Sequence, residues 1–262
     1  AALYVLLPNT AEIHLNLTNA HWRLAFLAAL VWSVNPSKSQ FFDHLVLLLA
    51  ALTGPFAIYL LFVECLLYRR SAATNLKSSR TVTLLVGALI QLSAIFLHSA
   101  QRPHHAEWTD LSLVGQLLGG QVMTAGLLGY RTYLELFPWL QHHPSVSMLL
   151  LFTLSLIFAI TGFVVPTSRR LICFAYLLML SAVISPTVTV PSGSVLEAMS
   201  VPGAATRYWF LPIITLFICL VQLLFYWKNL GGRIFVASLL LVSGIGIVRD
   251  FRFDPWPYAG FE

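Results

Sequence analysis

One short segment places a cation and aromatic rings at the start of a long apolar run. Arg207, Tyr208 and Trp209 follow a loop rich in proline, glycine and serine at residues 186–194. Arginine forms paired hydrogen bonds with phosphate oxygens and keeps its charge at low dielectric. The two rings offer flat faces to a sugar or an isoprenoid chain. The segment therefore predicts a site for a lipid-linked phosphate, although the same residues also anchor helices at a membrane boundary.

A second polar cluster precedes the first apolar run. It contains Glu12, Asn16, Asn19 and His21. Amide and hydroxyl groups at the entrance of a helix can cap its first N–H groups, but one residue is enough for that task. The same groups can line a sugar-binding cleft, and both interpretations stay open from the sequence.

Paired histidines form a third group. Carboxylates at Glu107 and Asp110 lie nearby in sequence, so these residues could bind a divalent metal. Their spacing matches no defined ligand pattern, which favours histidines that are solvated at the membrane boundary. The weak metal candidates are His104, His105, His142 and His143.

The composition places these residues in a membrane protein. The chain has 262 residues, of which 58% are hydrophobic and 10% charged, with a mean hydropathy of +0.81. Soluble domains carry about 25% charged residues. No basic stripe is interleaved with aromatic residues, which excludes nucleic acid as a partner. We expect residues 1–262 to form one all-α transmembrane domain that contacts membrane lipids.

Apolar runs predict a polytopic bundle of about six to eight membrane helices. About 20 apolar residues cross a bilayer as a helix. The clear spans are His44–Tyr68, Thr81–Ser99, Ser145–Val165, Leu171–Ser185, Tyr208–Trp227 and Ile234–Val248. Two shorter or more polar runs, Ala20–Val34 and Leu111–Gly129, are ambiguous. Gly54-Pro55 should kink the helix that contains it.

The distribution of charge predicts the orientation of the bundle. Three loops rich in Lys and Arg and free of acids, 69–80, 166–170 and 228–233, should face the cytoplasm. Segments 100–143 and 186–207 and the tail 249–262 then lie outside. If Leu111–Gly129 crossed the membrane fully, the cationic loop 166–170 would lie outside. We therefore expect this run to be re-entrant or interfacial. The same logic puts residues 35–43 outside.

Glu64 is the single acid within a predicted span. An acid inside a membrane is a functional candidate by default. Because Glu64 lies shortly before Arg69 and Arg70, we expect a pair with these cations at the membrane surface. The chain begins at Ala1 without a methionine, and we expect it to be the later part of a longer protein.

Three motifs resemble one family. They are Asn16-Leu17-Thr18-Asn19-Ala20-His21-Trp22 with the preceding Glu12, Leu52-Thr53-Gly54-Pro55-Phe56, and Arg207-Tyr208-Trp209-Phe210-Leu211-Pro212. Together they resemble bacterial polytopic glycosyltransferases of the GT-C type. The resemblance covers most of the chain in architecture but only these motifs in detail.

The resemblance implies an enzyme of the bacterial inner membrane. It would move a sugar from a polyprenyl-phosphate carrier to an acceptor on the extracytoplasmic side. Arg207 would pair with the carrier phosphate, and residues 12–22 would border the sugar or the acceptor. The catalytic acid of that family usually lies in the first outer loop, which we expect to precede Ala1. No residue here matches that acid, and Glu12 is our substitute candidate for it. The lipid-linked sugar is the implied donor, and a divalent metal stays an option.

Two rival functions remain. A transporter usually has polar residues in several spans or broken helices in paired halves, and here only Glu64, Gln91 and Gln222 qualify. A non-catalytic subunit that joins other membrane subunits is the stronger rival. An outer cavity lined by Arg207 and carboxylates would favour the enzyme, whereas a filled bundle with an exposed apolar flank would favour the subunit.

Overall fold

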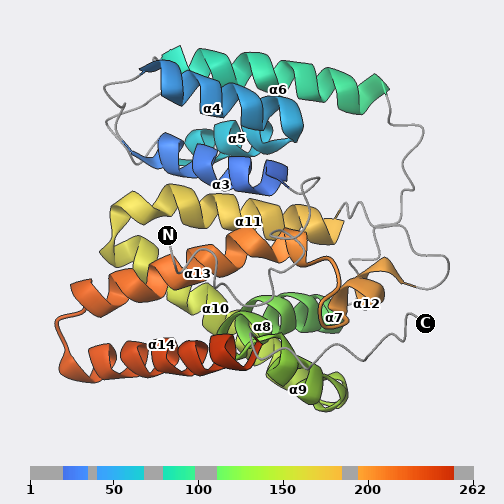
Figure 1. The fold of residues 1–262 in the computed structure, drawn as a ribbon, viewed down its shortest axis with the longest axis vertical. Helices are drawn as coiled ribbons and strands as arrows, with labels where there is room; N and C mark the ends of the chain where they lie inside the picture. The colour runs from blue at the N-terminus through green and yellow to red at the C-terminus, as the bar shows by residue number, and fades with distance from the viewer. Residues whose placement is uncertain (1–19, 35–39, 68–78, 98–110, 185–193, 251–262) are drawn as a thin grey trace, which may run out of the picture.

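The computed structural model describes residues 20–34, 40–67, 79–97, 111–184 and 194–250, and every regular element in these ranges is a helix (Figure 1). The predicted all-α fold is therefore confirmed. Six helical stretches are long and apolar enough to cross a membrane, and one further pair of helices passes the same test together but is sharply bent. The chain is thus an integral membrane helical protein.

The six candidate spans lie close to the apolar runs of the sequence. They are α6 (Ser79–Leu97), the stretch α7 (Leu111–Gly115), η5 (Gln116–Thr124) and α8 (Ala125–Leu128), α10 (Pro144–Val164), η6 (Pro166–Ser168) with α11 (Arg169–Ile184), α13 (Thr206–Tyr226) and α14 (Leu230–Asp250). The shorter helices are α3 (Ala20–Ser33), α4 (Gln40–Thr53), α5 (Phe56–Leu67), α9 (Tyr130–His142) and α12 (Val195–Ser200).

The predicted span His44–Tyr68 is a bent pair of helices. α4 and α5 meet at Gly54-Pro55 with a bend of 114°. Proline lacks an N–H group, and its ring collides with the carbonyl of the preceding turn, so α4 cannot continue through Pro55. The carbonyl of Pro55 instead accepts the first bonds of α5, from the N–H groups of Ile58 and Tyr59. The predicted kink is confirmed, but it returns the chain instead of only tilting a span.

The long helices run across Figure 1, with α11 and α13 between the N-terminal group α3–α6 and the pair α10 and α14. The end at which α4, α6, α11 and α14 begin is called the cationic end. The end at which α3, α10 and α13 begin is called the opposite end. Basic residues at the cationic end are Arg80, Arg169, Arg170, Lys228 and Arg233.

The stretch Leu111–Leu128 packs against the parts of its neighbours near the opposite end. Gly119 lies against the carbonyl of Ser147 in the first turn of α10, and Gly126 lies against Ile213 in the first half of α13. Leu128 meets Gly246 in the last turns of α14. These neighbours agree with the interfacial or re-entrant placement that the charge pattern predicts, although the stretch is long enough to span.

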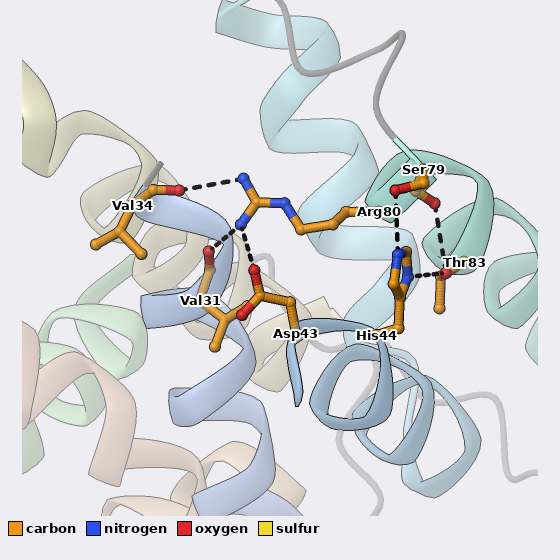
Figure 2. A network of polar contacts seen from close by, with 7 residues as sticks. All are labelled: Val31, Val34, Asp43, His44, Ser79, Arg80 and Thr83. Carbon is orange, nitrogen blue, oxygen red and sulfur yellow. Dashed lines mark hydrogen bonds and ion pairs between the residues drawn. The ribbon is translucent and has the colours of Figure 1, made fainter. Parts of the chain in front are cut away.

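A buried arginine joins three helices at the cationic end (Figure 2). Arg80 of α6 is 2% exposed and donates to the carbonyls of Val31 (2.7 Å) and Val34 (3.2 Å), at the end of α3. The same guanidinium lies 3.5 Å from Oδ2 of Asp43, in the first turn of α4. The last carbonyls of a helix have no partner within it and carry partial negative charge, so Arg80 caps α3 while Asp43 neutralises the cation.

This contact corrects the predicted position of residues 40–43, the described part of the segment 35–43. Asp43 and Arg80 lie at the same end of the bundle, and His44 lies beside them, with Nδ1 2.7 Å from Oγ1 of Thr83 and Nε2 3.1 Å from Oγ of Ser79. The prediction treated His44–Tyr68 as one crossing. Because α4 and α5 return to the end at which they started, the start of α4 lies with the cationic loops.

Glu64 also has a different partner from the expected one. Its carboxylate accepts two hydrogen bonds from Arg170 of α11, from Nε to Oε2 (3.1 Å) and from Nη2 to Oε1 (3.3 Å). Arg69 and Arg70 lie outside the described residues. The paired geometry satisfies both carboxylate oxygens of a side chain that is 1% exposed, and it joins the end of α5 to α11.

We expect the Arg80→Met protein to lose about 3–5 kcal/mol of unfolding free energy, because the change leaves a buried carboxylate and two helix-end carbonyls without their partner. The control is Arg249→Met, which removes an exposed pair with Glu135 and should cost below about 1 kcal/mol. Thermal unfolding in detergent micelles measures both. Equal, small losses would contradict the structural role of Arg80.

Labelling from one side of the membrane tests the corrected topology. In a background with Cys65, Cys173 and Cys219 replaced by alanine, we expect single cysteines at Gln40 and Lys228 to react with an impermeant maleimide from the same side. A cysteine at His143 should react from the other side only. Labelling of position 40 together with position 143 would restore the original prediction and reject the helical return at Gly54-Pro55.

Candidate functional site

A cavity of about 160 Å³ lies at the bend between α4 and α5. It is surrounded by side chains from α3, α4, α5, α11 and α13. The lining residues are His21, Trp22, Thr53, Gly54, Pro55, Phe56, Tyr59, Leu178, Ser181 and Tyr208. Because His21 begins α3 and Tyr208 begins α13, the cavity lies towards the opposite end of the bundle.

Aromatic rings hold the wall of the cavity together. The ring of Trp22 meets Phe56 edge-on at 5.4 Å and Tyr208 edge-on at 5.5 Å, and His21 stacks on Phe56 at 6.1 Å. Edge-to-face rings at such distances attract each other beyond the burial of their surface. The cluster brings together residues from three separate parts of the chain, which the sequence alone does not connect.

These three parts are the segments that carry the family resemblance. His21-Trp22 belongs to the first motif, Gly54-Pro55-Phe56 to the second and Tyr208 to the third, and all of them line the one cavity. From the sequence we predicted only a helix kink at the second motif, with no contact between it and the other two. The structure gives the three motifs a common position.

Arg207 lies beside the cavity without lining it. Its Cζ atom is 5.3 Å from the centroid of the Tyr208 ring, within the range of a cation–π contact, and the side chain is half-buried. Arg207 is also in the first turn of α13, at the positive end of the helix dipole, which favours anions. An anionic group next to Arg207 would therefore have an apolar cavity one residue away.

Trp209 occupies a different position from its neighbours. It is fully buried, and its indole N–H donates to the carbonyl of Ala204 at 3.4 Å. Its ring packs in the core and does not line the cavity, so in this structure Trp209 supports the turn before α13 and has no face available to a sugar. Tyr208 reaches the cavity and Trp209 does not, because the two side chains lie on different sides of α13.

The other sequence candidates fall into two groups. His142 and His143 are exposed at the end of α9, where the ring of His143 stacks on Trp139 at 4.5 Å. Within the described ranges, no three His, Cys, Asp or Glu residues come together as a metal site would require. The remaining candidates lie outside the described residues: Glu12, Asn16, Asn19, His104 and His105.

The sequence did not single out the contribution of α11. Leu178 and Ser181 line the cavity opposite the bend, but a serine in an apolar run is usual and carries no signal of its own. The hydroxyl of Ser181 donates to the carbonyl of Leu178 (2.9 Å), and that of Thr53 donates to Leu49 (2.9 Å). Since both hydroxyls are bonded to their own helices, the wall that they form is effectively apolar.

The lining has no acidic side chain among the described residues. A cavity with this lining can bind an apolar chain next to a cation, and its described residues include the imidazole of His21 but no carboxylate. Any carboxylate that acts at this site must come from outside the described ranges, where Glu12 lies in sequence close to His21.

No protein-family model matches the chain, and no curated protein or solved structure matches it significantly. The fold and the geometry of the cavity are therefore the structural basis for assigning a function.

Two neighbouring substitutions test the cavity. Ser181→Leu adds carbon atoms into open space, so we expect the unfolding free energy to change by less than about 1 kcal/mol. Ala182→Leu adds a larger side chain one position along α11, where the residue is fully buried and does not line the cavity, and should cost about 1–3 kcal/mol. Thermal unfolding in micelles compares them. A larger loss for Ser181→Leu would show that the cavity is filled by protein.

Proposed function

We propose that this chain is a membrane glycosyltransferase-like protein that takes its sugar from a polyprenyl-phosphate carrier. The observation that carries the proposal is the meeting of His21-Trp22, Gly54-Pro55-Phe56 and Tyr208 around one apolar cavity beside Arg207. These are the same segments that resemble the GT-C glycosyltransferases. The lipid-linked sugar is the one ligand that the proposal requires.

The cavity and Arg207 suit the two halves of such a carrier. The isoprene units nearest the phosphate would lie against the rings of Trp22, Phe56 and Tyr208. Its phosphate would lie beside Arg207 at the N-terminal end of α13, where a charge-assisted hydrogen bond and the helix dipole act on the same group. An apolar ligand or a free phosphate would use only half of this site.

The cationic end supplies the orientation of the proposed site. Loops rich in Lys and Arg stay in the cytoplasm, and this end carries Arg80, Arg170 and Lys228. The cavity lies towards the opposite end, so the carrier would be bound from the extracytoplasmic side. Loops 69–80, 166–170 and 228–233 would then be cytoplasmic, as the charge pattern predicts.

The proposed reaction is a displacement at the anomeric carbon of the sugar. A carboxylate removes the proton of the acceptor hydroxyl as the new bond to carbon forms. The bond from the anomeric carbon to the carrier phosphate breaks, and Arg207 stabilises the charge that develops on the leaving phosphate. Glu12 is our candidate for the carboxylate, because the cavity wall in the described ranges has none.

A non-catalytic subunit is the second candidate, and two observations favour it. The described cavity lining lacks a carboxylate, as stated above. In addition, α14 is mostly apolar between Arg233 and Arg249 but buries only Val236, Ser243 and Gly246, which leaves a wide apolar flank. That flank could contact lipid or another membrane subunit.

The Arg207→Ala protein should bind the carrier about 10–100-fold more weakly, since it loses a charge-assisted hydrogen bond worth about 1.5–3 kcal/mol. We would measure saturable binding of a radiolabelled polyprenyl-phosphate sugar to the protein in nanodiscs. The control is Arg249→Ala, a cation on α14 whose partners are Glu135 and Thr132, and its affinity should match that of the wild type.

The unphosphorylated polyprenol separates the two halves of the site. Arg207→Ala should leave its affinity unchanged, whereas Ser181→Leu should weaken the polyprenol and the phosphate sugar alike. If the folded wild-type protein binds no carrier, the glycosyltransferase proposal fails and the subunit becomes the better assignment.

A further inference from the structure

The turn that leads into α13 has an unusual backbone. Gly203 has a φ of +79° and Ala205 a φ of +53°, and Ala205 is the one non-glycine residue of the described ranges with a positive φ. A left-handed backbone costs about 1–2 kcal/mol for a residue with a Cβ, so other contacts must hold it. This turn determines where Arg207 and Tyr208 lie, because both follow Ala205 directly.

Gln121 holds the beginning of this turn. Its Nε2 atom donates to the carbonyls of Met199 (3.0 Å) and Val201 (2.8 Å) and lies 3.4 Å from that of Ser200. These are carbonyls at the end of α12, which have no partner within that short helix. Because all three neighbours are acceptors, the side-chain nitrogen must face them. Gln121 is fully buried, so no water replaces it there.

Tyr133 of α9 holds the same point from a second direction. Its hydroxyl donates to the carbonyl of Ser200 at 2.9 Å, and the side chain is 1% exposed. Burial raises the pKa of the Tyr133 phenol, so the group stays protonated and remains a donor over the whole physiological range. Gly120 packs directly against this hydroxyl and leaves no room for a Cβ.

Further hydrogen bonds continue from the end of α12 into α13. The carbonyl of Val201 also accepts from the N–H of Ala204 (3.0 Å), and the carbonyl of Ala204 accepts from the indole of Trp209 (3.4 Å). Gln121 is thus connected through Val201 and Ala204 to Trp209, two residues after Arg207. The buried position of Trp209 has its explanation in this connection.

The helical segment that carries Gln121 is itself unusual. Gln116–Thr124 is a π-helix, and all nine of its residues are buried. π-Helices are rare and occur often at functional sites. In this segment Gly119 lies against α10, Gly120 against Tyr133, and Gln121 reaches α12. Three successive residues therefore contact three different neighbouring helices: two glycines allow close approach, and Gln121 supplies the hydrogen bonds.

We infer that Gln121 and Tyr133 are positioning residues that place Arg207 and Tyr208 at the cavity. The inference rests on the proposed function, in which Arg207 binds the carrier phosphate. Neither residue lines the cavity, so both act through the backbone of residues 199–205. They act mainly on the phosphate-binding half of the site. Of the rings in the apolar half they reach only Tyr208, because Trp22 and Phe56 lie on α3 and α5.

The test compares affinity for a polyprenyl phosphate with affinity for the matching polyprenol in nanodiscs. The ratio of the two measures the contribution of the phosphate. We expect Gln121→Leu and Tyr133→Phe to lower this ratio about tenfold and to change polyprenol affinity less than twofold. The control is Gln222→Leu, which removes a part-buried hydrogen bond from Ser168 at the cationic end and should leave the ratio unchanged.

A variant that lost affinity for both lipids equally would show a general structural role and overturn the inference. Hydrogen exchange of the ligand-free protein gives a second readout. Amides of residues 201–208 should exchange at least tenfold faster in Gln121→Leu than in the wild type, while those of α11 should not change.

Unchanged exchange at residues 201–208 would overturn the inference whether or not the lipid binds. A wild-type protein that does not distinguish the phosphate from the alcohol would instead refute the proposed function. In that case the exchange measurement alone decides whether Gln121 positions Arg207 and Tyr208.

Discussion

The arrangement of this bundle depends on one buried guanidinium. A bilayer provides no partner for the last carbonyls of a helix, so the end of α3 needs a donor from the protein itself. Arg80 supplies it and is in turn neutralised by Asp43, which joins α3, α4 and α6 at one point. Glu64 and Arg170 form a second such contact between α5 and α11. The start of α4 and the end of α5 are therefore both held at the cationic end.

Because the start of α4 and the end of α5 are both held at the cationic end, the bend between them lies towards the opposite end of the bundle. Pro55 cannot remain inside a helix, and the open space next to it is closed by rings from α3 and α13. The cavity thus follows from a break in a helix whose two halves are firmly anchored. The turn before α13 has a comparable support, because Gln121 and Tyr133 hold the end of α12. Two separate sets of buried polar contacts consequently support the two halves of the proposed site.

The apolar runs predicted the fold class and most of the helix positions, but the charge pattern placed the start of α4, residues 40–43, at the wrong end. When spans are counted along a chain, successive loops are assigned to alternate sides of the membrane. A helical return that is counted as one crossing therefore puts the loop before it on the wrong side. Gly54-Pro55 predicted a bend, but no local feature states its angle. The return becomes visible only through Arg80, whose partners lie 37 and 49 residues earlier in the sequence. Such long-range partners leave no periodic signal.

The sequence by itself determined that this protein is a helical membrane bundle, because apolar runs of sufficient length have no other stable form in lipid. It also singled out Arg207 and Tyr208, since an arginine followed by aromatic residues at the start of an apolar run is visible locally. Only the tertiary structure separated Tyr208, at the cavity, from the buried Trp209, and only it added Ser181 and Gln121. The physical reason is that side chains meet across helices according to packing and to the pairing of buried polar groups, which sequence spacing does not encode.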